Sequence, residues 1–315
     1  MNIDVSYNNF MSVKMKSVSR KYAINEFKTV GLVLIIYCLF ALYVPIALKE
    51  FIPLTGYTEF MGYDVYLLGS LACLVLGTVI PFMLLRIRSG KSLSDFNQPV
   101  DMSVSDYLVH FIVFFALSTA AIFVTMMTAQ HINVSGQLVS SIGITINSDY
   151  LSDIVYVIAF ILITPILEEY AFRGVLLTCL SRYGKYFAAI ASSLIYALAH
   201  GSFIEMVPSF IMGYMLSKIS LYHKSVKPCI VIHVLFNLSL YGLFMVPEKY
   251  SLYMMVVLAL IIILAVVLLT GRIYRVVKIK KSGTNKKVGM MFLTTVSVCV
   301  ALMLFVLHSM LMIVL

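Results

Sequence analysis

The sequence predicts an all-α fold, a polytopic transmembrane helical bundle of about nine spans, and three observations support this. Hydrophobic residues make up 61% of the 315 positions and charged residues only 12%, against about 45–50% and about 25% in soluble domains. Several apolar runs reach the roughly 20 residues that a helix needs to cross about 30 Å of hydrocarbon. Short charged segments separate these runs, so one large water-soluble core is excluded.

Each predicted span is an apolar run bounded by polar or charged residues. The first run is too long for the apolar part of a cleavable signal, so we expect it to remain as an anchor. A Ser- and Asn-rich loop at 131–150 precedes the fourth run, and a basic linker at 271–289 precedes the last. The nine runs are 29–48, 65–85, 107–129, 151–180, 186–200, 203–219, 228–246, 251–269 and 290–315.

The basic residues predict the orientation of the spans. With a cytoplasmic N-terminus, all 23 Lys and Arg residues fall in inside segments except Lys49, Lys249 and Arg173. Cytoplasmic loops of membrane proteins accumulate these residues. Because the cations are spread over five separate segments, they form no continuous stripe, and no nucleic acid is expected as a partner.

Composition divides the chain into four predicted regions. They are a cytoplasmic N-terminal segment (1–28), the N-terminal transmembrane helices and loops (29–150), a core of four helices (151–246), and the C-terminal transmembrane helices with the basic linker (247–315). The core holds most of the polar residues that are out of place in a membrane.

Charged residues within the fourth span indicate a site, since each costs about 2.5–3.5 kcal/mol to insert. Glu169 and Arg173 are spaced i and i+4, so they lie on one helix face and can form an ion pair, which could also be purely structural. Glu168 points about 100° away from them, towards a different neighbour. Pro165, just upstream, can bend the span.

Three further polar residues are expected to join Glu168. His200 and Glu168 lie at similar distances from the turn near Gly184. His233 and Asn237 share a helix face but, by residue counting, should lie at a shallower depth in the membrane. A carboxylate, two imidazoles and an amide around a wet cavity can activate water and stabilise an oxyanion. Glu168, His200 and His233 could equally bind a divalent metal such as zinc, and the sequence leaves both chemistries open.

The motifs Glu168-Glu169-x-x-x-Arg173, Tyr196-x-x-x-His200 and His233-x-x-x-Asn237, in this order, resemble those of the CaaX protease and bacteriocin-processing (Abi) family. The resemblance covers about residues 151–241. It implies an intramembrane endopeptidase with a catalytic core at 151–246. Glu168 and His200 would activate water, His233 and Asn237 would stabilise the oxyanion, and Glu169 and Arg173 would support them. Tyr196 replaces the usual Phe, where it is expected to act as a packing wall.

The resemblance also sets expectations for partners and location. The substrate would be a peptide or protein, hydrophobic or lipidated, and membrane lipid would surround the enzyme. The Lys-, Ile- and Asn-rich loops suggest a bacterial plasma membrane, where relatives mature peptides or give self-immunity to bacteriocins. A non-catalytic scaffold, an immunity protein or a transporter using the same polar cavity is the alternative.

Overall fold

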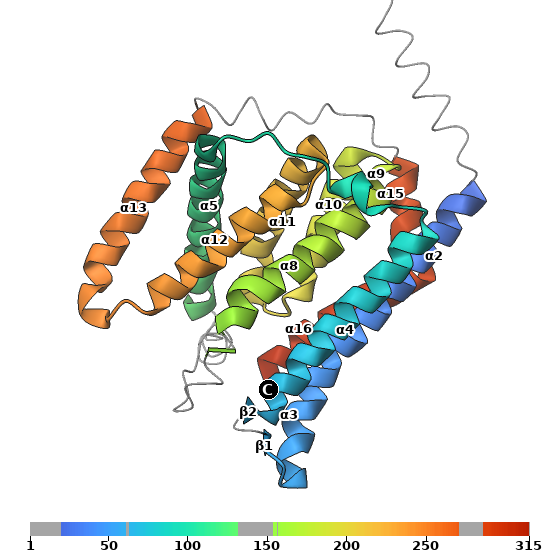
Figure 1. Ribbon diagram of the computed structural model, residues 1–315, viewed down its shortest axis with the longest axis horizontal. Helices are drawn as coiled ribbons and strands as arrows, with labels where there is room; N and C mark the ends of the chain where they lie inside the picture. The colour runs from blue at the N-terminus through green and yellow to red at the C-terminus, as the bar shows by residue number, and fades with distance from the viewer. Residues whose placement is uncertain (1–19, 61–62, 132–153, 156, 271–285, 315) are drawn as a thin grey trace, which may run out of the picture.

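The computed structural model describes residues 20–60, 63–131, 154–155, 157–270 and 286–314, and in these ranges the chain is almost entirely helical (Figure 1). One two-stranded antiparallel hairpin, β1 (Glu59–Phe60) with β2 (Tyr63–Asp64), joins two helices. The predicted all-α class is therefore confirmed. The helices are α2 (Arg20–Tyr37), η1 (Cys38–Tyr43), α3 (Val44–Thr55), α4 (Val65–Arg88), η2 (Leu93–Phe96), α5 (Val104–His131), η3 (Ala159–Ile163), α8 (Thr164–Glu168), η4 (Glu169–Leu176), α9 (Leu177–Ser181), α10 (Lys185–Ala199), α11 (Phe203–His223), α12 (Lys227–Phe244), η5 (Glu248–Tyr250), α13 (Ser251–Leu268), α15 (Lys286–Leu293) and α16 (Val296–Val314).

Local sequence explains several helix boundaries. Asp64 caps α4 by accepting backbone hydrogen bonds from Tyr66 (2.7 Å) and Leu67 (3.2 Å). Gly184 (φ +132°) and Gly201 (φ +72°) adopt left-handed backbone conformations immediately before and shortly after α10. Such conformations favour glycine, so the predicted turn near Gly184 lies where the sequence indicates.

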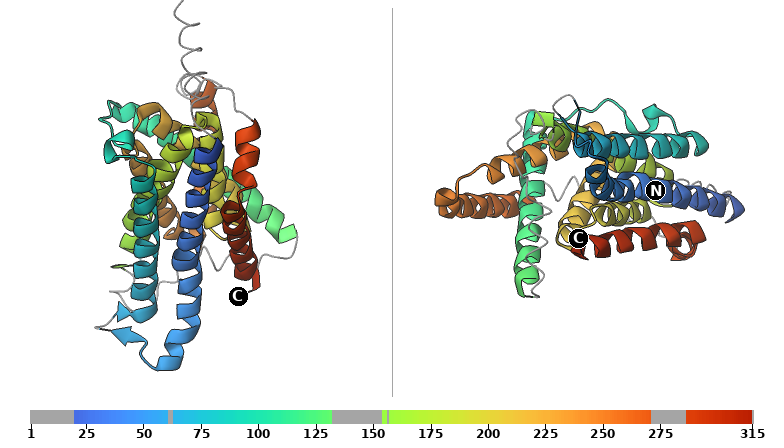
Figure 2. Two further views of the ribbon diagram at one scale, coloured as in Figure 1. Left: turned by 90° about the vertical axis from the view of Figure 1, so that its right-hand side faces the viewer. Right: turned by 90° about the horizontal axis from the view of Figure 1, so that it is seen from below.

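The helices form a bundle with the core of the chain in the middle. In Figure 1, α13 and α5 lie on one side, α2, α4 and α16 on the other, and α8 and α10–α12 between them. The view from below in Figure 2 shows α13 at the outer edge of the bundle. Only 6% of the residues of α13 are buried, as expected of a lipid-facing helix.

Four described helices are long and apolar enough to cross a membrane: 20–55, 65–88, 104–125 and 251–268. A fifth forms if the pair 287–293 and 296–311, which bends by 65°, is counted as one span. The chain is thus an integral membrane protein. Helices also occupy the predicted spans of the core, but α10 and α12 are short and the segment 159–181 is interrupted by π-helical turns.

Close helix packing and a chain of aromatic rings connect the outer helices to the core. A Cβ atom on Gly31 of α2 would lie only 2.5 Å from the backbone of Ser297 on α16, so glycine is needed for this approach. Tyr37 of α2 contacts the ring of Phe172 at 5.8 Å, and Phe172 contacts Tyr196 of α10 at 5.3 Å. The N-terminal helices therefore pack directly against the segment that carries the polar motifs.

Candidate functional site

The helix that carries Glu168 and Glu169 changes its winding between these two residues. Pro165 lies in the first turn of α8, which ends at Glu168, and the π-helix η4 begins at Glu169. A π-helical turn is wider than an α-helical one and is frequent at functional sites. The two neighbouring glutamates therefore differ in surroundings: the Glu168 side chain is 17% exposed and that of Glu169 is fully buried.

Glu169 is the anchor of a buried ionic cluster. Its Oε1 lies 3.0 Å from Arg173 Nη1, as the i, i+4 spacing predicts. The same oxygen lies 3.0 Å from Nδ1 of His233 on α12. The Arg173 guanidinium also lies over the Tyr196 ring, 3.9 Å from its centroid. Because both partners of the Glu169–Arg173 pair are fully buried, removing either one would leave a costly unpaired charge.

The hydrogen bond to Glu169 orients His233 towards Glu168. With its Nδ1–H donating to Glu169, the ring directs Nε2 at Glu168, whose Oε2 lies 3.9 Å away. This separation is too long for a direct hydrogen bond. A water molecule or a substrate oxygen can contact both atoms at that separation.

His200 is oriented in a similar way by its own helix. Its Nδ1 lies 2.9 Å from the carbonyl oxygen of Tyr196, so Nδ1–H donates and Nε2 is left for other partners. The His200 ring stands edge-on to the Tyr196 ring at 4.6 Å, and the His233 ring does so at 6.4 Å. The Tyr196 ring therefore contacts both histidine rings.

Asn237 lies one turn beyond His233 on α12. Its side-chain amide donates to the backbone oxygen of Phe160 at 2.8 Å, which fixes the amide against the helix that leads to Glu168. An asparagine amide has two N–H donors, so the second can still serve a ligand.

The level of His233 differs from the expectation. Residue counting placed it shallower than Glu168, yet its Nε2 lies 3.9 Å from the Glu168 carboxylate. The helix does not begin earlier than the sequence indicates, because α12 starts at Lys227. The other explanation that the sequence allows is that spans four and five tilt or extend into the cytosol, so residue counting alone gave the wrong relative depth.

The described residues contain no group of three or more His, Cys, Asp or Glu side chains arranged to hold a metal ion. Glu168, His200 and His233, which the sequence left open as metal ligands, do not form such a group in this geometry. The Nδ1 atoms of both histidines are already hydrogen-bonded, which leaves one ring nitrogen of each for the site.

Two residues near the site were not assigned to it from the sequence. Glu205 lies in the first turn of α11, five residues after His200. Tyr37 of α2, 4% exposed, packs against Phe172 of η4, the helix that begins at Glu169. Nothing in the sequence distinguishes Tyr37 from the other residues of its apolar run.

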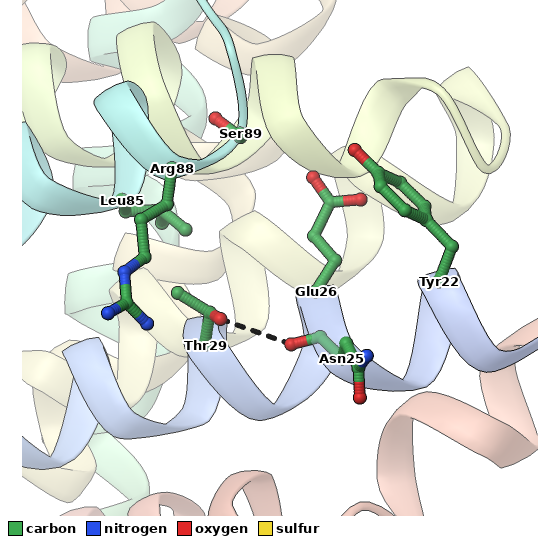
Figure 3. A pocket seen from close by; sticks show the side chains of 7 residues that line it. All are labelled: Tyr22, Asn25, Glu26, Thr29, Leu85, Arg88 and Ser89. Atoms are coloured by element: carbon green, nitrogen blue, oxygen red, sulfur yellow. Dashed lines mark hydrogen bonds between the residues drawn. The ribbon is translucent and has the colours of Figure 1, made fainter.

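A surface groove elsewhere contains none of the predicted site residues. It lies between α2 and the end of α4. Beside it, Glu26 forms an ion pair of 3.3 Å with Arg182 and accepts a hydrogen bond from the Tyr183 hydroxyl group. These contacts tie α2 to the turn before α10, roughly 20 Å along the helix from Glu168. The groove is lined by Tyr22, Asn25, Glu26, Thr29, Leu85, Arg88 and Ser89 (Figure 3).

Comparison with known proteins agrees with the motifs. Residues 150–239 match the family model described as "Type II CAAX prenyl endopeptidase Rce1-like". Searches of curated proteins and of solved structures found no match. The chain therefore carries, at residues 150–239, a domain of the Rce1-like type II CAAX prenyl endopeptidase family, consistent with the CaaX protease and bacteriocin-processing family that its motifs resemble.

Proposed function

We propose that this chain is an intramembrane endopeptidase in which Glu168 activates the water that attacks a peptide bond. The observation that supports this most strongly is the pair of side chains 3.9 Å apart, Glu168 Oε2 and His233 Nε2, inside the domain that matches the endopeptidase family. A general base must reach the water whose proton it takes. Glu168 is the more exposed of the two glutamates, and Glu169 is already held by Arg173 and His233.

The reaction follows from the donors and acceptors at the site. Glu168, assisted by His200, accepts a proton from water as the water oxygen attacks the scissile carbonyl carbon. His233 Nε2–H and the second Asn237 N–H donate to the oxyanion. The proton then moves to the leaving amine, and the carbon–nitrogen bond breaks. Glu169 and Arg173 keep His233 in place, and donors to an oxyanion contribute most when they are held in place in this way.

The substrate of this reaction is a hydrophobic or lipidated peptide or protein. The site lies among helices of an integral membrane protein, so an apolar segment or a lipid anchor is what brings a substrate to it. We place the protein in a bacterial plasma membrane with nine spans and a cytoplasmic N-terminus, as the basic residues of the loops favour. Its role there is peptide maturation or self-immunity to a bacteriocin.

The test is cleavage of a library of hydrophobic and lipidated peptides by the purified protein in detergent. Wild type should cleave at least one peptide, and Glu168→Gln should be slower by about 10²- to 10⁴-fold because the base is lost. Glu50→Gln removes an exposed carboxylate elsewhere and serves as the control. A chelator should leave the rate unchanged if no metal takes part. Equal cleavage by wild type and Glu168→Gln would refute the assignment of the base.

A further inference from the structure

Two π-helical segments flank the short helix α8, which ends at Glu168. In each segment a side chain from another helix donates a hydrogen bond to a backbone carbonyl oxygen. In η3 the donor is Asn237, which contacts the oxygen of Phe160. In η4 the donor is Ser192 of α10, whose hydroxyl oxygen lies 2.8 Å from the oxygen of Phe172. The helix that carries Glu168 is therefore attached on both sides to neighbouring helices.

The hydrogen bond from Ser192 supports a carbonyl group within the π-helical winding. Ser192 is completely buried, so its hydroxyl group needs an acceptor inside the protein. The Phe172 oxygen also accepts the backbone N–H of Leu177, five residues later, as is typical of a π-helix. Both lone pairs of this oxygen are thus used, one within η4 and one by α10.

The winding of η4 determines where Arg173 points. π-helical turns are rare, and α-helical winding would shift the residues after Phe172 by one position, about 100° around the helix axis. The peptide unit that Ser192 holds by its oxygen contains the backbone nitrogen of Arg173. This contact from α10 therefore opposes a change to α-helical winding.

The Arg173 side chain has little room to adjust to such a change. Its guanidinium lies over the Tyr196 ring, 3.9 Å from the centroid. A Cβ atom on Gly213 of α11 would lie 3.1 Å from Nη2 of Arg173 and 3.1 Å from Cδ1 of Tyr196. A shift of the Arg173 backbone would therefore disturb the contacts of its guanidinium.

A continuous set of contacts leads from Ser192 to the general base. Arg173, whose peptide unit Ser192 holds, contacts Oε1 of Glu169 at 3.0 Å. The same oxygen lies 3.0 Å from Nδ1 of His233. His233 in turn directs its Nε2 at Glu168, 3.9 Å away. The position of the Phe172–Arg173 peptide unit thus bears on the direction of the His233 ring.

We propose that Ser192 is a positioning residue: by holding the Phe172–Arg173 peptide unit it keeps η4 in π-helical winding and thereby keeps His233 directed at Glu168. This inference rests on the proposed function, because it assigns Ser192 to the catalytic residues of that reaction. Ser192 acts through the backbone of η4 and then through side chains that are themselves buried.

The first test compares two neighbouring buried serines. Ser192→Ala should lower kcat by about 10- to 100-fold, because a displacement on the order of 1 Å can cost about 100-fold in rate. KM should stay within about 2-fold, since Ser192 is buried away from any substrate. Ser193 is equally buried, but its hydroxyl group lies 2.6 Å from the oxygen of Ala189 in its own helix. Ser193→Ala should therefore leave kcat within about 2-fold of wild type.

The second test does not require cleavage. Phe172–Arg173 is the only Phe-Arg pair in the sequence, so ¹³C-carbonyl phenylalanine with ¹⁵N-arginine labels one peptide bond for solid-state NMR. Ser192→Ala should move this carbonyl signal and the ring ¹⁵N signals of His233, which are assigned by their loss in His233→Gln. Ser193→Ala should move neither.

The two tests fail in different ways. If wild type cleaves no peptide, the proposed function fails, and the NMR signals still decide whether Ser192 positions His233. Unchanged His233 signals in Ser192→Ala, or an equal loss of kcat in Ser193→Ala, would overturn the proposal.

Discussion

Replacing Gly201 with alanine perturbs the residue that follows His200, and the structure allows the effect to be worked out. Gly201 has φ +72°, and a Cβ atom there would lie 2.5 Å from Nδ1 of His308 on α16 and closer still to Cε1 of the same ring. His308 is only 6% exposed, and its ring packs against Tyr43 at 5.6 Å. The histidine therefore has little room to move away.

Two costs add for this substitution. The left-handed backbone costs alanine about 1–2 kcal/mol, and the overpacking against His308 costs about 1–3 kcal/mol more. Gly90 gives the matched control, because it has φ +64° but a Cβ atom added there would meet no other atom within 4 Å. We therefore expect Gly201→Ala to lose about 2–5 kcal/mol of unfolding free energy and Gly90→Ala to lose about 1–2 kcal/mol.

The free energies of unfolding are measured by denaturant titration of both variants in detergent micelles. The double variant Gly201→Ala with His308→Ala should recover the overpacking part of the loss, which a double-mutant cycle isolates. Gly201→Ala should also slow cleavage more than Gly90→Ala, because His200 is the adjacent residue. Equal losses of stability in the Gly201→Ala and Gly90→Ala variants would refute the contact with His308.

Other substitutions test the surroundings of the site. Arg173→Met should lower the free energy of unfolding by about 3–5 kcal/mol, since it leaves Glu169 buried without its cation. Denaturant titration measures this loss, and a loss below about 1 kcal/mol would contradict the burial of the Glu169–Arg173 pair. Gly213→Ala should lower kcat and lower the free energy of unfolding by about 1–3 kcal/mol. Gly242→Ala, where the new Cβ has no atom within 4 Å, should change neither quantity. Similar losses of unfolding free energy in both variants would contradict the crowding at α11.

The sequence predicted those parts of the site that depend on helical spacing. Glu169 and Arg173 form the expected pair, and His233 and Asn237 lie one turn apart on α12. The π-helical turns of η4 could not be anticipated, because apolar periodicity in a fully apolar span does not report the winding of the helix. The different burial of Glu168 and Glu169 accompanies that change of winding.

Contacts between distant helices were harder to predict. Tyr37 meets Phe172 of η4 only because α2 packs beside α4, and pairing of that kind leaves no mark in a uniformly apolar run. The relative depth of His233 depends on helix inclination, which residue counts do not contain. Four described helices, or five with the bent pair, meet the length and hydropathy of a span, and the count of nine stays a prediction from loop charges.

The central claim is that side chains from separate helices act on one water molecule as a single catalytic unit. A double-mutant cycle of Glu168→Gln and His233→Ala on kcat/KM tests this most directly. We predict that the double variant is no slower than the slower of the two single variants, because members of one unit lose their effect together. Losses that multiply in the double variant would show that the two residues act independently and would contradict the account.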